Sequence, residues 1–508
     1  MYRIHEIKLG IEEEKSAIPD KIKKKLKTQA EIITYKIVKE SLDARDKGDI
    51  TYVYTVDFST NIEIPGLSKV EEIPYQYPAK ATKQMERRPV VVGFGPCGMF
   101  AALILSELGY APIVLERGKR VEDRANDVEL LWNEGILNEE SNVQFGEGGA
   151  GTFSDGKLTT GIKDIRVRKV LEELVLAGAD EDILYKQKPH IGTDELRKIV
   201  KNIRQRILEN GGEMQFSTRL DDVVIKGNKL IGIKVCDENG CREIDTEHLV
   251  LAIGHSARDT IRSLHKAGLA MEQKPFSIGV RIEHPQQRID QSQYGKNANK
   301  NLPPAEYKLS HRCKDGRGVY TFCMCPGGEV IIASSQEGGV VTNGMSNRTR
   351  SGKYANSAVL VDVKTSDFES EHPLAGIAFQ EKYETIAYQK AGEQYKAPQA
   401  TWSEFERGAA SALPVIESLP DFAVNGIKEA MPYFARRLKN FDDPGARLYA
   451  VESRSSSPVR INRDEHFQSN IMGIYPGGEG AGYAGGIMSA AVDGIKIAEE
   501  IIKDVSRR

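Results

Sequence analysis

The stretch RRPVVVGFGPCGMFAALILSELGYAPIVLERG, residues 87–118, decides the fold. It reads as a short apolar strand, a glycine turn, a helix that stops at Gly109 and a second strand that ends at Glu116. In such a strand–turn–helix unit, Gly93 permits the tight turn and Gly95 removes the side chain where a pyrophosphate approaches the backbone. The free N–H groups and the dipole of the helix N-terminus face that anion. The unit therefore predicts a Rossmann-type dinucleotide site.

Four further residues of this unit follow the same pattern. Gly98 lets the helix pack closely on the strand, and Pro96 suits a first helical turn, where the N–H is not needed. Glu116 stands about 20 residues beyond the motif, where an acid accepts hydrogen bonds from a ribose. Cys97 lies beside a helix N-terminus that would lower its thiol pKa. This position normally holds a small residue, so we expect steric fit to be the reason for Cys97.

The composition is that of an ordinary globular protein. The 508 residues are 40% hydrophobic and 28% charged, with a net charge of −3, and they suffice for two or three domains. A near-neutral chain offers no electrostatic footprint for nucleic acid or an anionic membrane. The N-terminus lacks the plan of a secretory signal, and no apolar run reaches the roughly 20 residues of a membrane helix. We expect a cytoplasmic protein, and no metal site because the six cysteines form no CxxC motif.

The remaining pattern divides the chain into domains. Residues 1–72 predict a small βαββ domain of ferredoxin-like α+β type, whose lysines are interpreted as a solvated face because acidic residues are interspersed. The proline-rich residues 73–88 are expected to be a linker. An α/β domain should occupy residues 89–269 and resume over 441–508. Strands and helices between them, residues 270–440, predict an inserted α+β substrate domain, with the substrate cavity at the domain interface.

Three more segments distinguish FAD from NAD. Residues 142–161 form a glycine-rich loop that we expect to be too polar and flexible for the core and able to wrap a phosphate–ribityl chain. Residues 248–254 are an apolar strand ending in Ala-Ile-Gly, which resembles a segment of flavoproteins. Residues 474–502 carry a glycine-rich turn with Glu479 and then a helix, a pattern that places a helix N-terminus beside the flavin. The strands between the first two segments resemble those of FAD folds in which the position of Leu220 reaches the adenine through its backbone.

With these motifs together, the chain resembles the bacterial family of NAD(FAD)-utilising dehydrogenases, which is similar to geranylgeranyl reductases and para-hydroxybenzoate-hydroxylase-type flavoproteins. The likeness rests on GFGPCG, ERG, VQFGEGGAGTFSDGKL, AIGHSARDT, TFCMCPGGEVI, NGMSNRT and PGGEGAGYAGG. It implies an FAD-binding domain of glutathione-reductase type and supplies no substrate. The predicted FAD-binding residues are Gly93, Gly95, Pro96, Gly98, Glu116, Arg117, Arg124, Gly149, Ser154, Gly156, Lys157, Leu220, Ala252, Gly254, Gly478, Glu479 and Gly480.

The candidate substrate residues are Cys323, Cys325 and Arg281. In GVYTFCMCPGG, period-two alternation puts both cysteines on one face of a strand, with Cα atoms about 6.5 Å apart at the outer limit of disulfide geometry. A redox disulfide is expected only if the strand bends at Pro326. We interpret the thiols as small buried side chains that shape a cavity, with a catalytic thiol as the alternative. Prenyl reductases carry aromatic residues here, so a prenyl substrate is not expected.

These observations predict an FAD-dependent oxidoreductase, a dehydrogenase or reductase that transfers hydride through the flavin to or from a small organic substrate. No second strand–GxGxxG–helix unit is expected, so NADH or NADPH would dock transiently. The alternatives are a flavin monooxygenase and a flavin-bound regulatory or binding protein that works through its N-terminal domain, including an RNA-associated one. The N-terminal segment shows no aromatic pair in a basic setting, which disfavours RNA.

The residues that carry out catalysis are not identified by these patterns. His255, Arg281 and His284 could contact substrate or flavin, but we interpret them as polar surface residues. No Ser/His/Asp or paired-carboxylate arrangement can be recognised, because spacing alone does not reveal one. The electron donor and the oligomeric state are left open as well.

Overall fold

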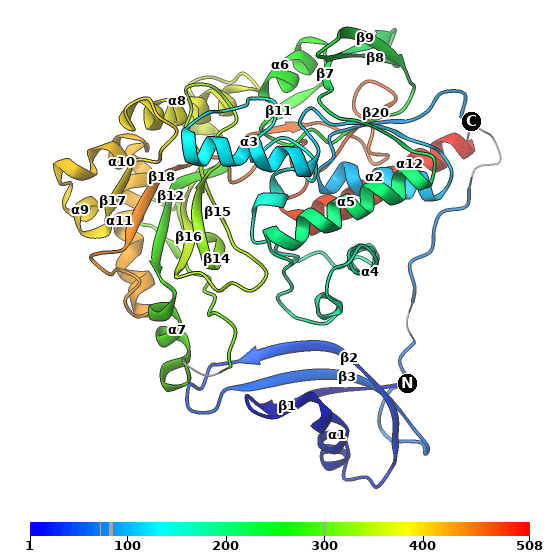
Figure 1. Ribbon diagram of the computed structural model, residues 1–508, viewed down its shortest axis with the longest axis vertical. Helices are drawn as coiled ribbons and strands as arrows, with labels where there is room; N and C mark the ends of the chain where they lie inside the picture. Colours follow the sequence, from blue (N-terminus) through cyan, green and yellow to red (C-terminus); the bar gives the residue numbers. More distant parts are fainter. Residues whose placement is uncertain (72, 81–84, 299–300, 508) are drawn as a thin grey trace.

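The computed structural model describes residues 1–71, 73–80, 85–298 and 301–507 (Figure 1). Parts of the predicted N-terminal domain, linker, insertion and C-terminal segment, residues 72, 81–84, 299–300 and 508, lie outside the described residues. The fold is mixed α/β and has three parts. In Figure 1 a small N-terminal sheet lies below, an α/β domain lies above it to the right, and a cap, built on a second large sheet, lies to the left.

The N-terminal part has the predicted βαββ order. Its elements are β1 (Tyr2–Gly10), α1 (Ile18–Leu26), β2 (Ile32–Asp43) and β3 (Thr51–Thr60). The antiparallel sheet has the order β1-β3-β2, so β1 and β2 run parallel with β3 between them. This is the split βαβ arrangement of ferredoxin-like folds. Ile22 of α1 and Phe58 of β3 are fully buried in the core between helix and sheet.

The N-terminal part touches both other parts of the molecule. At one end of its sheet, Ile50 is buried in the hydrophobic core of the cap, and Lys47 Nζ donates to the carbonyl oxygen of Ser292, 2.7 Å away. Close to the same hairpin, the backbone of Glu40 in β2 exchanges hydrogen bonds with Tyr185 and Gln187 of the α/β domain. The small sheet therefore spans the cap and the α/β domain.

The α/β domain is built on a parallel sheet with the order β20-β10-β4-β5-β6. These strands are β4 (Val90–Val92), β5 (Ile113–Leu115), β6 (Glu213–Gln215), β10 (Leu249–Leu251) and β20 (Ile474–Pro476). The strand order reverses beside β4, where the chain proceeds to β5 on one side and returns through β10 on the other. In open α/β sheets, ligands bind at the carboxyl ends of strands at such a reversal.

Helices cover the parallel sheet on one side and an antiparallel sheet lies on the other. The helices of this domain are α2 (Pro96–Glu107), α3 (Val121–Glu134), α4 (Arg166–Leu176), α5 (Thr193–Glu209), α6 (Arg258–Lys266) and α12 (Ile487–Arg507). Helices α2, α5 and α12 share one core, seen side by side in Figure 1. The predicted strands after β6 form the antiparallel sheet β7 (Arg219–Lys226), β8 (Lys229–Asp237) and β9 (Gly240–Asp245). Strand β11 (Met271–Gln273) pairs with β19 (Val459–Ile461).

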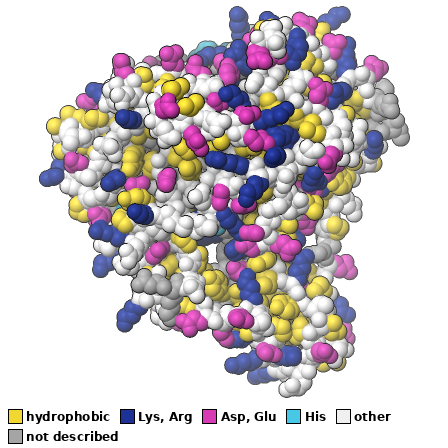
Figure 2. All heavy atoms as spheres, viewed as in Figure 1, with side chains coloured by type: hydrophobic (Ala, Val, Ile, Leu, Met, Phe, Trp, Pro, Cys, Tyr) yellow, Lys and Arg dark blue, Asp and Glu magenta, His cyan; other side chains and the backbone are white. Residues whose placement is uncertain are grey.

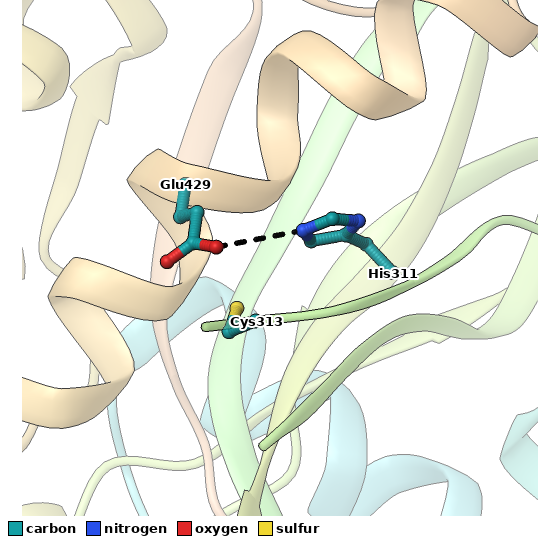
Figure 3. Close-up of side chains that lie close together, drawn as sticks. All are labelled: His311, Cys313 and Glu429. Carbon is teal, nitrogen blue, oxygen red and sulfur yellow. Dashed lines mark ion pairs between the residues drawn. The ribbon is translucent and has the colours of Figure 1, made fainter. Parts of the chain in front are cut away.

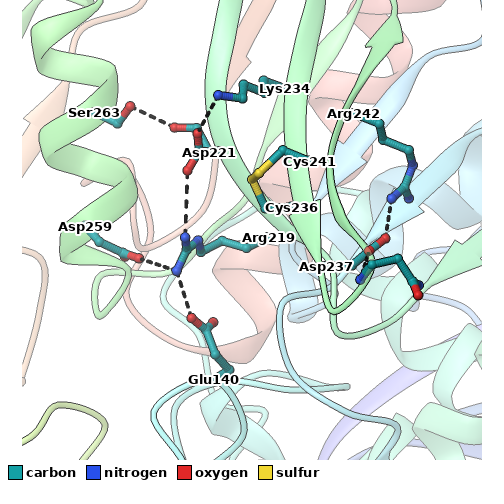
Figure 4. Close-up of a disulfide and its surroundings, with 11 residues drawn as sticks. Glu140, Arg219, Asp221, Lys234, Cys236, Asp237, Cys241, Arg242, Asp259 and Ser263 are labelled. Atoms are coloured by element: carbon teal, nitrogen blue, oxygen red, sulfur yellow. Dashed lines mark hydrogen bonds and ion pairs between the residues drawn. A yellow bond between two sulfur atoms is a disulfide. The ribbon is translucent and has the colours of Figure 1, made fainter.

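A disulfide that the sequence reasoning did not anticipate joins β8 to β9. It links Cys236 and Cys241, which face each other across the hairpin (Figure 4). The remaining four cysteines are free thiols.

The cap sheet has the order β13-β14-β16-β12-β18-β17, with β15 paired to β14. Its strands are β12 (Phe276–Pro285), β13 (Ser310–Arg312), β14 (Gly318–Ile332), β15 (Thr342–Met345), β16 (Tyr354–Val363), β17 (Gln399–Thr401) and β18 (Arg447–Glu452). Its helices are α7 (Gln286–Tyr294), α8 (Ala375–Lys390), α9 (Trp402–Arg407), α10 (Leu413–Glu417) and α11 (Asp421–Arg437). Because β18 pairs with β12, the cap runs past the predicted boundary at residue 440. The chain turns after α11 and re-enters the same sheet.

The linker is held against the α/β domain by two tyrosines. Tyr75 donates to Glu499 and Tyr77 donates to Glu107, and the ammonium group of Lys169 lies over both rings. The face in view in Figure 2 shows acidic and basic side chains interspersed, as expected from a net charge of −3. Within the described residues, no helix combines the length and apolar character needed to cross a membrane.

A buried ion cluster joins the cap to the α/β domain. Glu384 of α8 lies 2.8 Å from both Arg258 of α6 and Arg454, which follows β18, and the three side chains are at most 3% exposed. Burial alone would raise the pKa of Glu384, but the two guanidinium groups hold it far below the ordinary value. Arg454 also donates to Ser256 of the α/β domain and Ser335 of the cap. The charges of this cluster are therefore paired across the domain boundary.

We predict that Glu384→Gln strongly destabilises the protein, because it removes the carboxylate that pairs with two buried arginines. Removing one partner of a buried pair costs about 3–5 kcal/mol. The matched control is Arg262→Gln, which removes a surface ion pair to Glu381 of the same helix and should cost at most about 1 kcal/mol. Urea unfolding followed by circular dichroism measures both variants. Equal midpoints for the two variants would contradict the role of the cluster.

Candidate active site

One cavity of about 560 Å³ extends from the carboxyl ends of β4 and β10 to the cap sheet. At one end it is lined by Glu116 and Leu220, near the start of the antiparallel sheet. Its middle passes the turn at Gly95, and its far end reaches Cys323 and Tyr307 of the cap. The cavity therefore joins the predicted dinucleotide turn to the predicted substrate domain.

The three glycines of GFGPCG are required for different reasons. Gly93 has φ +94°, and a Cβ there would lie 2.3 Å from the carbonyl oxygen of Ala252. A Cβ on Gly98 would lie 1.9 Å from the carbonyl oxygen of Gly93, so the helix could not pack on the strand. A Cβ on Gly95 would meet only the Cα of Gly149, at 3.7 Å. Gly95 thus leaves space for a ligand, whereas Gly93 and Gly98 are fixed by packing.

Glu116 is positioned by backbone donors. Its Oε1 accepts from the N–H groups of Gly118 and Gly146, and its Oε2 accepts from Phe94 at 2.9 Å. The carboxylate lines the cavity, and a carboxylate oxygen can accept two hydrogen bonds. Oε2 can therefore accept a ribose hydroxyl while its backbone bond is kept.

Arg124 organises the glycine loop from outside the cavity. It is fully buried, and its guanidinium donates to the carbonyl oxygens of residues 142, 143, 146, 147 and 149. It does not line the cavity, so the geometry gives it a positioning role in place of the predicted FAD contact. The predicted flexibility of this loop is also wrong. Most of its residues are buried, because Arg124 and Glu116 satisfy backbone groups that would otherwise need water.

Most of the other predicted FAD-binding residues meet in this cavity. Those lining it are Gly93, Gly95, Pro96, Glu116, Arg117, Gly149, Ser154, Lys157, Leu220, Ala252, Gly254, Gly478 and Glu479. Those behind its wall are Gly98, Arg124, Gly156 and Gly480. A Cβ on Gly480 would lie 2.5 Å from the backbone of Gly254, so Gly480 brings two wall segments together. Arg117 lies over the ring of Phe145 and pairs with Asp259.

Cys97 is a packing residue. A Cβ on Gly477 would lie 2.8 Å from its sulfur, and one on Gly494 would lie 2.0 Å from its carbonyl oxygen. Burial raises the pKa of the Cys97 thiol well above its ordinary value. The lowering expected from the helix N-terminus is therefore wrong, because desolvation outweighs the dipole.

The C-terminal turn brings a second helix end to the cavity. Gly485 and Gly486 line it, and α12 begins at the next residue. Residues 480–485, GAGYAG, also have GxGxxG spacing and lie between strand β20 and helix α12. The expectation that the chain has no second strand–GxGxxG–helix unit is therefore wrong.

Two titratable groups face each other at this end of the cavity. His255 Nε2 lies 4.0 Å from Glu479 Oε1. Burial lowers the pKa of His255 to about 3, and Arg454 and Arg258 add to this effect. Burial raises the pKa of Glu479 to about 7, against the attraction of Lys274. Near neutral pH the pair is thus a neutral imidazole beside a carboxyl group that can hold or release a proton.

The cap end of the cavity departs from the predicted alternation. Cys323 lines the cavity, whereas Cys325 is fully buried behind it. Phe322, predicted on the opposite face, lines the cavity too and is 42% exposed. The reason is a bulge in β14, where Cys323 takes φ +43°. The two thiols therefore do not share one face of a regular strand.

Arg281 and His284 are not the polar surface residues that we expected. Both side chains are fully buried. Arg281 pairs with Glu452 at 2.9 Å and lies behind the bulge, outside the cavity wall. His284 bonds the carbonyl oxygen of Phe441 at 2.7 Å. Both residues lie on β12, a central strand that is buried on both faces, which the sequence pattern did not reveal.

Sequence reasoning missed several lining residues. They are Gln144, Ser256, Glu306, Tyr307, Asn343, Glu452 and Arg454. Glu452 and Arg454 belong to VESRSSSP, a polar run at the end of a strand, and this pattern could have marked them. Glu306 and Tyr307 lie in an irregular segment whose letters carry no comparable signal.

Outside the cavity, His311, Cys313 and Glu429 place one ligand atom each within 4.8 Å of the others (Figure 3). Glu429 accepts from the backbone N–H of Lys314, and His311 stacks on Tyr433 at 3.8 Å. Burial raises the pKa of the Cys313 thiol to about 11. His311 and Glu429 thus interact with neighbouring protein groups, and Cys313 is held as a neutral thiol. The expectation from the sequence that the chain has no metal site stays a prediction.

The cavity fits FAD in shape and in chemistry. A helix N-terminus at each of α2 and α12 suits an anion, Glu116 suits a ribose, and the glycines leave room for a bound chain. Residues 275–455 match the sequence model of a family described as "FAD-dependent protein, C-terminal domain-like", and residues 1–59 match a domain of unknown function. The predictions of FAD as cofactor and of an FAD-dependent enzyme are thereby confirmed.

A protein from Clostridium beijerinckii, described as an uncharacterised protein, is 46% identical over 528 aligned positions. The match covers 99% of this chain and 98% of the relative. The chain therefore belongs to the same family as that protein.

Solved structures show more distant likeness. A triple mutant of a flavin-dependent brominase is 15% identical, with a TM-score of 0.41 over 83% of this chain and 81% of its own. A geranylgeranyl bacteriochlorophyll reductase-like protein from Thermoplasma acidophilum is 12% identical, with a TM-score of 0.36 over 82% and 79%. A glycerol-3-phosphate dehydrogenase from Bacillus halodurans, complexed with FAD, is 13% identical, with a TM-score of 0.36 over 84% and 65%. At these scores the likenesses say nothing of the reaction that this chain catalyses.

We predict that Gly95→Val lowers the flavin content of the purified protein about tenfold or more, because the new side chain enters the space left for the ligand. The control is Gly161→Val, at an exposed position where a Cβ meets nothing within 4 Å. Absorbance near 450 nm per mole of protein measures the content. Wild-type stoichiometry in Gly95→Val would show that no ligand approaches this turn.

The environment of Cys323 leads to a pH prediction. A hydrogen bond from Cys325, together with the positive charges of Arg281 and Lys157, lowers the pKa of Cys323 below that of an ordinary thiol. Alkylation of Cys323 by iodoacetamide, followed by peptide mass mapping, should therefore have its pH midpoint below about 8.5. In Cys325→Ala the midpoint should rise, because the donor is lost. In Cys313→Ala, a change outside the cavity, it should not move. The same midpoint in all three proteins would contradict this account.

Proposed function

We propose that this chain is an FAD-dependent oxidoreductase of dehydrogenase or reductase type, related to the NAD(FAD)-utilising dehydrogenases, that binds FAD in the manner of glutathione-reductase-type folds. The observation that supports this most is the single cavity that joins the dinucleotide turn at Gly95 to the cap at Cys323. When bound, FAD supplies a hydride acceptor and donor. The protein itself binds and orients the cofactor and provides groups that hold or release a proton.

Each end of the cavity has a distinct task in this proposal. The N-terminus of α2 binds the pyrophosphate and Glu116 binds the ribose, which orients the cofactor along the cavity. The N-terminus of α12 offers a positive dipole end where negative charge develops on the ring. Glu479 holds or releases a proton near neutral pH, with His255 beside it as a neutral partner. The cap covers this end and limits the access of water.

The cap end suits a small polar organic substrate. Lys157, Lys188 and Glu306 bring charges of both signs to the wall, and Asn343 adds an amide. Tyr307 adds an aromatic ring whose hydroxyl lies 2.9 Å from Ser357 Oγ. The expectation that a prenyl chain is not the substrate stays a prediction. NADH or NADPH would reach the flavin by transient docking.

The test is an anaerobic reductive titration of the yellow protein with NADH, NADPH and a library of small organic acids, alcohols and amines. We expect at least one donor to bleach the absorbance near 450 nm, since the cavity extends from the turn at Gly95 to the cap. Failure of every donor would contradict the proposal. Peroxide or an oxygenated product on readmission of air would indicate a monooxygenase instead.

A further inference from the structure

The two cysteines of β14 lie on a bulge in place of a regular strand. Phe322 pairs with Ala358 and Cys325 pairs with Asn356, so β14 contains one residue more than β16 over this interval. Cys323 has φ +43°, a left-handed value that non-glycine residues rarely adopt. Backbone strain of this kind clusters at functional sites. The bulge is also the bend without which two cysteines separated by one residue cannot approach each other.

Cations from both domains hold the bulge. Arg281 of the cap donates to the carbonyl oxygen of Cys323, and Lys157 of the α/β domain donates to that of Met324, the residue between the cysteines. The guanidinium Nη2 of Arg281 also lies 3.8 Å from the sulfur of Cys325. Positive charge close to a thiol favours the thiolate, which is the reactive form in disulfide exchange.

The two sulfurs are arranged front to back. Cys323 lines the cavity, and fully buried Cys325 lies behind it, with its Sγ 3.3 Å from the carbonyl oxygen of Cys323. The Cys325 thiol donates to that carbonyl oxygen, and the two thiols influence each other's pKa in opposite directions. Glu479 lines the same cavity as Cys323. One thiol is therefore exposed to the cofactor site, and the other is within reach only of the first.

We propose that Cys323 and Cys325 form a thiol–disulfide couple that exchanges two electrons with the flavin. This inference rests on the proposed function, because it requires FAD in the cavity. It adds an internal redox centre to the site and identifies thiols or disulfides as a chemical class that the site can act on.

The step balances within the protein and its cofactor. One Sγ–Sγ bond forms between the Cys323 thiolate and the Cys325 thiol, and the S–H bond of Cys325 breaks. The pair loses two electrons and one proton, and oxidised FAD gains both to become the anionic reduced flavin. In the reverse direction the reduced flavin returns the electron pair and the proton, and the disulfide becomes a thiolate and a thiol.

The alternative is that two small side chains merely shape the cavity. Packing alone requires neither a left-handed residue at Cys323 nor cations on two consecutive carbonyl groups. Burial raises the pKa of Cys97 and Cys313, whereas the pKa of Cys323 is lowered. If the two cysteines only shape the cavity, replacing Cys323 or Cys325 by serine should leave the number of electrons taken up per flavin unchanged.

The experiment counts electrons in a background without the other disulfide, Cys236–Cys241, which lies on an outer hairpin of the α/β domain (Figure 4). The Cys236→Ser, Cys241→Ser protein is oxidised, freed of oxidant and titrated anaerobically with dithionite at 450 nm. We expect about two molecules of dithionite per flavin, and about one after the further change Cys325→Ser or Cys323→Ser. Intact-mass measurement after alkylation in denaturant should show the oxidised background protein lacking two alkyl groups.

The outcomes separate the two proposals. The couple is contradicted if the background protein takes up about one dithionite per flavin, or if Cys323 and Cys325 are still free thiols after oxidation. In either case a visible flavin spectrum would still support the proposal that the protein binds FAD. A disulfide that forms without raising the amount of dithionite taken up per flavin also contradicts the couple, because the flavin then exchanges no electrons with it. A protein that binds no flavin overturns the proposed function as well, and its colourless spectrum distinguishes that result.

Discussion

The carboxylate of Glu384 is shared by two arginines, Arg258 from the α/β domain and Arg454 from the strand end of the cap. The cavity has walls from both domains, so its width depends on how they are joined. In a low-dielectric interior, an unpaired charge is far more costly than a paired one. Separating the domains would expose or unpair these groups, and this favours one docked arrangement. Arg454 and Ser256 line the cavity themselves, so the same contacts that join the domains form part of its wall.

Local patterns were sufficient to predict the framework. The βαββ order of the N-terminal part, the parallel sheet around β4 and the strands after β6 follow from periodicity and turn residues over a few positions. The cradle around Gly93 and Gly95 follows from steric needs that any strand-to-helix pyrophosphate turn shares. Such features depend on neighbours in the chain, and the sequence records them directly.

Features that depend on distant partners were not predictable in the same way. The end of the cap at Glu452 is set by pairing between β12 and β18. The interior position of Arg281 depends on its ion pair with Glu452 and on the bulge in β14, which the residues TFCMCPGG do not predict. Arg124 was predicted to bind the cofactor, yet its guanidinium donates to five carbonyl groups of a folded loop. In each case the deciding contact joins positions that the sequence separates.

The N-terminal sheet contacts the cap near Ile50 and the α/β domain near Glu40. Its β2–β3 hairpin thus contacts both the cap and the α/β domain, the same two domains that the Glu384 cluster joins elsewhere. Two separate attachments between a pair of domains remove the hinge that a single attachment would allow. We therefore expect the two domains to keep one relative position, so that selection among substrates depends on the side chains of the cavity wall.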